Sequence, residues 1–105
     1  MSIITIKTNE SLKLTDNVVI HNNKEKYHPE NLQKISILTR DTSPFIADDV
    51  ALALFFTNAT LVLPSEHFCY QEIYDSLSAS LPLDYAKIIK AMSCTENAEF
   101  IIWTI

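Results

Sequence analysis

Seven acidic residues lie between Arg40 and Lys87, and no lysine or arginine lies between them. They are Asp41, Asp48, Asp49, Glu66, Glu72, Asp75 and Asp84, so this block carries −7 while the whole chain carries −5. Carboxylates can bind a cationic protein, hold a hard metal ion or act as acid–base groups. A one-signed block repels nucleic acid and anionic lipid and attracts basic proteins. We therefore expect a basic protein partner, and neither nucleic-acid nor membrane binding.

The adjacent pair Asp48 and Asp49 is the first candidate for metal or acid–base chemistry. A divalent cation needs several converging oxygens, whereas adjacent residues of a strand point to opposite faces. The surrounding loop also lacks the ligand series of an EF-hand. The pair is better explained as solvated loop acids, or as acids that contact a cationic partner.

Soft ligands and nucleophiles are the second candidate. His67, Cys69 and Cys94 would need a fourth ligand for zinc, and no Cys-x-x-Cys pair is present. A Cys–His nucleophile pair on these residues is weakly supported, because catalytic partners are usually distant in sequence. The chain also contains no glycine, which excludes Walker and dinucleotide-binding phosphate loops. We expect no enzyme activity, no metal and no cofactor.

The elements that position these residues follow from hydrophobic periodicity. Strands are predicted within residues 3–7, 12–21, 34–39, 50–56, 60–63 and 99–105, and residues 24–29 read as a polar connection. A helix capped by Ser65 is predicted to run to Leu81, and a second helix, capped by Asp84, to Met92. Turns must use Asn and Asp in place of glycine, and they are expected at 9–10, 16–17, 22–23, 58 and 97.

These elements predict a single α+β domain over residues 1–105. Its antiparallel sheet has five to six strands, two helices pack on one face, and the C-terminal strand rejoins the sheet. The apolar stripes of the helices are Tyr70, Ile73, Tyr74 and Leu77, then Tyr85, Ile88, Ile89 and Met92. The second face of the sheet still carries large apolar groups, and we expect sheet curling, rather than another chain, to bury them. The N-terminus does not resemble a signal peptide and no apolar run spans a bilayer, so a cytoplasmic location is expected.

Residues 33–105 resemble a small family of bacterial toxin-immunity proteins of the contact-dependent growth inhibition type. The matching segments are 45–50 (FIADDV), 63–66 (LPSE), 81–85 (LPLDY) and 91–100 (AMSCTENAEF), followed by Trp103. Members of that family commonly have a glycine near the position of Ser93, which this chain lacks. The resemblance implies a small cytoplasmic protein that neutralises a cognate toxin domain, frequently a basic nuclease, by covering its active site.

Charge and resemblance therefore predict the same function, a non-enzymatic immunity protein that binds a basic toxin domain. The residues expected to bind the partner are Asp41, Phe45, Asp48, Asp49, Glu66, Glu72 and Asp75. Phe45 would act as an aromatic anchor in the acidic loop. A monomer is expected. The alternative is a scaffold subunit that self-associates through the second apolar face of the sheet.

Overall fold

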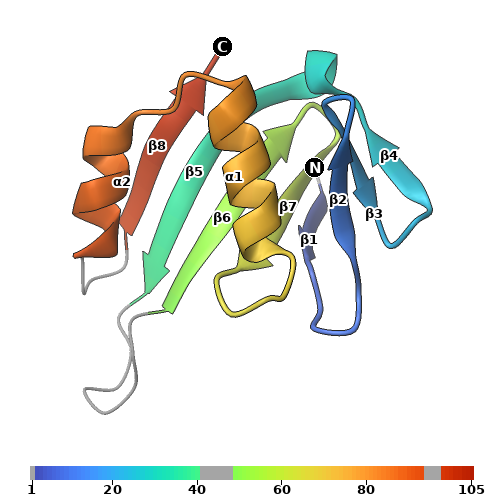
Figure 1. Cartoon of the computed structure of the whole chain (residues 1–105), viewed down its shortest axis with the longest axis horizontal. Helices are drawn as coiled ribbons and strands as arrows, with labels where there is room; N and C mark the ends of the chain where they lie inside the picture. Colours follow the sequence, from blue (N-terminus) through green and yellow to red (C-terminus); the bar gives the residue numbers. More distant parts are fainter. Residues whose placement is uncertain (1, 41–48, 94–97) are drawn as a thin grey trace.

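The computed structural model describes residues 2–40, 49–93 and 98–105. Within these residues the chain forms two sheets, two α-helices and a 3-10 turn. In chain order the elements are β1 (Ser2–Thr5), β2 (Leu12–Thr15), β3 (Val18–His21), β4 (Glu25–Tyr27), η1 (Pro29–Asn31), β5 (Leu32–Arg40), β6 (Asp49–Phe56), β7 (Ala59–Pro64), α1 (Tyr70–Ser80), α2 (Tyr85–Met92) and β8 (Ala98–Thr104). The predicted α+β class is confirmed, and β8 rejoins the main sheet (Figure 1).

The main sheet has five strands in the order β1-β7-β6-β5-β8. Strands β5 to β8 pair antiparallel, as predicted, but β1 pairs parallel with β7, with Ser2 opposite Ala59. The expectation of a wholly antiparallel sheet is therefore wrong at this edge. The physical reason is the connection: the chain leaves β1 for the small sheet and does not turn back on itself. Ile6 continues the parallel pairing, since its N–H donates to the Val62 carbonyl at 2.8 Å.

A separate sheet of three short strands is built from β2, β3 and β4. Its two turns place Asp16, Asn17, Asn22 and Asn23 at positive φ angles between 51° and 66°. These are two of the turns that the absence of glycine predicted, because Asn and Asp tolerate the left-handed region. Asn9 and Asn58, also predicted, do not have positive φ, and Asn97 lies outside the described residues. Strand β4 corrects the prediction of a polar connection at residues 24–29. The strand forms because the Tyr27 ring packs on the Phe56 ring of the core, with 5.2 Å between the ring centroids.

The core lies between the main sheet and a layer made of α1, α2 and the small sheet (Figure 1). Alternate residues of β6, from Val50 to Phe56, point into this core and are buried. From α1, Ile73 and Leu77 of the predicted stripe are buried against them, while Tyr74 is half-buried. The stripe predicted for α1 is thus confirmed as its packing face.

Helix α1 begins later than predicted. Its first residue is Tyr70 and its N-cap residue is Cys69. No side chain makes a capping hydrogen bond, so Ser65 does not cap the helix. Residues 65–69 instead form turns. The backbone N–H of His67 donates to the Pro64 carbonyl and the backbone N–H of Tyr70 donates to the His67 carbonyl, each at 3.0 Å. Helix α2 begins where predicted, because the Asp84 carboxylate accepts a hydrogen bond from the Lys87 backbone at 3.2 Å.

The stripe predicted for α2 is wrong as a packing face. Ile88 is buried, but Tyr85, Ile89 and Met92 are 52 %, 70 % and 51 % exposed. The helix packs against β8 and the neighbouring β5 through Ile88 and Ala91. Because β8 is the edge strand, nothing in the described chain extends beyond it to cover the rest of the stripe. Helix α2 therefore presents an apolar face to solvent.

The second face of the main sheet is only partly buried. Ala53, Ser36 and Thr60 are covered by their neighbours, whereas Phe55 is half-buried and Ile101 is 38 % exposed. No described helix or strand lies over this face, so the curvature of the sheet leaves part of its apolar area exposed. Neither described helix has the length and the apolar run needed to cross a bilayer.

Candidate protein-binding surface

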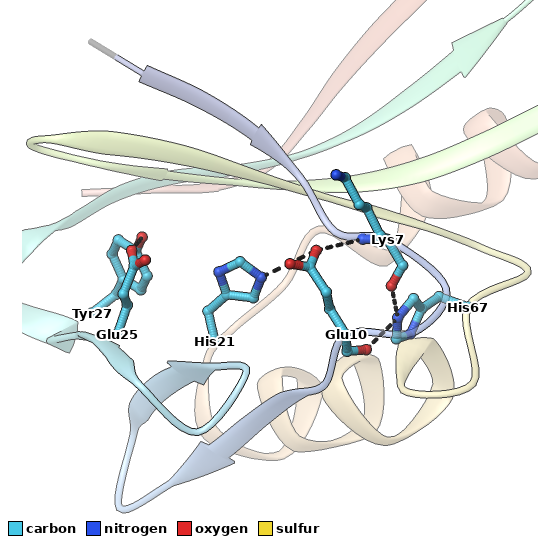
Figure 2. A network of polar contacts seen from close by, with 6 residues as sticks. All are labelled: Lys7, Glu10, His21, Glu25, Tyr27 and His67. Carbon is cyan, nitrogen blue, oxygen red and sulfur yellow. Dashed lines mark hydrogen bonds and ion pairs between the residues drawn. The ribbon is translucent and has the colours of Figure 1, made fainter.

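The turn that leads into α1 is held by the buried side chain of His67 (Figure 2). Its Nδ1 accepts the backbone N–H of Cys69 at 3.0 Å, and its Nε2 lies 2.9 Å from the carbonyl oxygens of Lys7 and Glu10. A backbone N–H can only donate, so Nδ1 carries no hydrogen and Nε2 must donate to the two carbonyls. The neutral ring thereby ties α1 to the segment between β1 and β2.

A second contact fixes that segment. The Glu10 carboxylate accepts the Lys7 backbone N–H at 2.9 Å, and it lies 3.4 Å from Nε2 of the buried His21 (Figure 2). The Lys7 N–H lowers the pKa of Glu10, and His21 lowers it further. The start of α1, the β1–β2 segment and the small sheet are thus joined by polar contacts as well as by the core.

Helix α1 exposes acidic side chains and contains no lysine, arginine or histidine. Glu72 and Asp75 lie three residues apart on its exposed side, and Glu66 is exposed in the preceding turn. Asp75 accepts a hydrogen bond from the Gln71 amide at 2.8 Å. Among the side chains that the structure describes, none of the three acids has an ion-pair partner. Their negative charge is therefore available to an external cation.

The same stretch of the chain carries aromatic side chains that reach the surface. Phe68 is 70 % exposed, and its ring stacks on the His67 ring with 4.6 Å between centroids. Half-buried Tyr74 stacks on Tyr70, and its pKa is raised by burial first and then by the charges of Tyr85 and Asp75. We call Glu66, Phe68, Glu72, Tyr74 and Asp75 the α1 surface. Exposed aromatic residues are enriched at protein-binding surfaces, and exposed acids attract a cationic partner.

The predicted partner-binding residues fall into two groups. Glu66, Glu72 and Asp75 belong to the α1 surface, whereas Asp41, Phe45 and Asp48 lie outside the described residues. Asp49 is the first residue of β6. The Ser65 N–H donates to the Val50 carbonyl at 2.8 Å, so the backbone at Asp49 and at Glu66 meets at one end of the sheet. The structure thus brings the start of β6 beside the start of the α1 surface.

Phe68 is not among the residues that the sequence predicted to bind the partner, and the predicted aromatic anchor, Phe45, lies outside the described residues. One signal was available: Phe68 precedes Tyr70 by two residues and so falls off the apolar stripe of the helix predicted to begin at Ser65. A large apolar residue outside the stripe of a short helix is more exposed than one inside it.

The chemical alternatives gain no support from the geometry. Both nitrogens of His67 are engaged with the backbone, and its contact to Cys69 is to the backbone N–H and not to the thiol. Cys69 is buried, and Cys94 lies outside the described residues. Over the described chain, no three His, Cys, Asp or Glu side chains are grouped in a way that would hold a metal ion.

The chain matches no protein-family model, and neither a characterised protein nor a solved structure is significantly similar to it. Its function is therefore inferred from the chemistry of its own residues.

Proposed function

We propose that this chain is a cytoplasmic immunity protein that binds and neutralises a basic toxin domain through the α1 surface. The observation that carries the proposal is that residues 66–75 hold three exposed acids, which have no described cationic partner, together with the exposed ring of Phe68. A nuclease is the expected class of toxin, because a nuclease active site presents cations to phosphates and a row of carboxylates imitates those phosphates.

The acids and the aromatic ring of the α1 surface are expected to contribute to binding in different ways, because all of them are exposed to solvent but only the acids are charged. Glu66, Glu72 and Asp75 are solvated, so each acid alone contributes little binding energy but together they raise the association rate. Phe68 has a large area to desolvate and a ring already held in place by His67. Such an aromatic side chain mainly slows dissociation. No residue of the chain needs to act on the toxin chemically.

The test is capture of partners by the tagged chain from a lysate of its own source, at low and at high salt. We expect a basic protein that is held at low salt and released at high salt, because salt screens exposed charges. The captured protein must also show a nuclease activity that the chain inhibits.

Matched variants decide whether the α1 surface is responsible. The double reversal Glu72→Lys/Asp75→Lys should abolish capture and inhibition. The control Glu25→Lys/Glu30→Lys changes the net charge equally at exposed acids that are not part of α1, and should retain both, although the Tyr27 hydroxyl loses its hydrogen bond to Glu25. Inhibition that survives the α1 reversal would overturn the assignment of this surface, and a chain that captures only itself would overturn the function.

One observation favours a second function, a self-associating scaffold subunit. The α2 face of Tyr85, Ile89 and Met92 is exposed, and no described element covers the second face of the main sheet. Light scattering separates the two functions. A dimer whose mass does not change with concentration would favour the scaffold, and a monomer would favour the immunity protein.

A further inference from the structure

A cavity of about 130 Å³ lies where the small sheet, the main sheet and the end of α1 meet. This place is at the opposite end of α1 from Phe68, because α1 runs from the turn at residues 65–69 towards η1 and the β2–β3 turn (Figure 1). The cavity is therefore distinct from the α1 surface.

The floor of the cavity is apolar and fully buried. Val19, Leu32, Phe56 and Leu77 form it, and each is at most 7 % exposed. Half-buried Trp103 forms part of the wall. The rings of Phe56 and Trp103 are stiff, and each is anchored in a different strand, so neighbouring side chains cannot easily close the space between them. The walls consequently lack dispersion contacts that a filling group would restore.

The rim differs from the floor, since its exposed residues include Asn17 of the β2–β3 turn and Ser80 at the end of α1. An amide and a hydroxyl can each donate and accept a hydrogen bond. Among the residues that the structure describes, no charged one lines the cavity. A charged ligand would therefore lose its hydration without gaining an ion pair, whereas a neutral ligand loses little.

The size of the cavity limits the possible ligands further. An apolar protein cavity of roughly 150 Å³ binds benzene, and the present cavity is close to that size. We propose that it is a binding site for a small neutral ring compound, about as large as a phenol, which buries its ring against Phe56 and Trp103 and places one hydrogen-bonding group at the rim. This site is independent of the proposed immunity function, and the ligand is a free small molecule.

The test uses p-cresol as the probe and benzenesulfonate as a charged ligand of similar size. Trp103 is the only tryptophan, so its fluorescence reports on the cavity directly. Methyl NMR spectra give a second readout, at Val19, Leu32 and Leu77. We expect p-cresol to cause a saturable change in fluorescence together with shifts confined to these methyl groups, and benzenesulfonate to cause neither.

A matched pair of variants locates the binding. Ser80→Phe places a ring at the rim, and should weaken p-cresol binding by about tenfold or more because it occupies the entrance. Ala79→Phe adds the same ring at the neighbouring exposed position, which does not line the cavity, and should leave binding unchanged. Both positions are exposed, and circular dichroism checks that both variants fold.

The proposal fails if p-cresol produces no saturable change up to its solubility limit. It also fails if benzenesulfonate binds as well as p-cresol, if Ser80→Phe and Ala79→Phe bind equally, or if the methyl shifts fall outside the cavity. The proposed immunity function is untouched by each of these results, because its test uses α1 reversals and a protein partner.

Discussion

Replacing His67 by alanine tests whether one buried ring holds the start of α1. The ring makes one hydrogen bond through Nδ1 and shares the hydrogen of Nε2 between two carbonyls. A buried hydrogen bond contributes about 1 kcal/mol, and a buried group that loses its partner costs about 1–3 kcal/mol. Removing the ring also leaves a cavity, since His67 is only 5 % exposed. We expect His67→Ala to lower the free energy of unfolding by about 3–4 kcal/mol.

Urea denaturation followed by circular dichroism measures this change. A domain of this size has a total stability of about 5–15 kcal/mol, so the variant remains folded at moderate temperature unless the chain lies at the low end. With a slope of about 2 kcal/mol per molar urea, the midpoint should fall by about 1.5–2 M.

Phe68→Ala is the matched control, because Phe68 is the next residue and its ring stacks on His67 but is 70 % exposed. It should change the free energy of unfolding by no more than about 0.5 kcal/mol. A loss below about 1 kcal/mol in His67→Ala, or an equal loss in Phe68→Ala, would refute the idea that the buried histidine supports α1.

Three further predictions concern other parts of the fold. Ile88→Ala should lower the free energy of unfolding by about 2–4 kcal/mol, while Ile89→Ala should change it by no more than about 0.5 kcal/mol; equal losses in urea denaturation would contradict the assignment of the exposed face of α2. Asp84→Ala should cost about 1 kcal/mol by the same measurement, because α2 loses its side-chain cap, and Asp84→Asn should recover most of this loss. The Ser36 hydroxyl donates a hydrogen bond to the Glu99 carboxylate at 2.6 Å and lowers the pKa of Glu99 below its usual 4.5; Lys34 lowers this pKa further. The carboxylate therefore contributes its full stabilisation above pH 4.5. That contribution is lost as the pH falls through the lowered pKa. Stability below about pH 4.5 should therefore depend less steeply on pH in Glu99→Gln than in the parent chain, and identical acid limbs would contradict this assignment.

Local chemistry was the part of the fold that the sequence predicted best. With no glycine available, left-handed turns required Asn or Asp, and the pairs at 16–17 and 22–23 adopt them. Asp84 caps α2 for a similarly local reason, since its carboxylate reaches a backbone N–H three residues away. Such features depend only on neighbours in the chain, so a single sequence is sufficient to find them.

Tertiary context accounts for the errors. Ser65 is a good N-cap residue, but His67 accepts the Cys69 N–H and the helix begins only at Tyr70. Periodicity correctly groups Tyr85, Ile88, Ile89 and Met92 on α2, yet it cannot show that this helix lies over an edge strand that buries only part of the stripe. The pairing of β1 with a strand so far along the chain has no local signature.

The candidate surface was predictable to a similar extent. Periodicity assigned the apolar stripe of α1 to the core, which left Glu72 and Asp75 on the exposed side, and there the structure has them. The meeting of Asp49 and Glu66 at one end of the sheet depends on the hydrogen bond between Ser65 and Val50, which no pattern in the sequence reveals.

The pairing of β1 with β7 limits when β1 can join the sheet as the chain is synthesised. Ser2 is opposite Ala59, so β1 has no partner in the main sheet until β7 has also been made. Strands β2, β3 and β4 have nearby partners and can pair in the meantime. Strand β1 therefore stays unpaired while β2 to β6 are made, and its pairing with β7 closes a long loop.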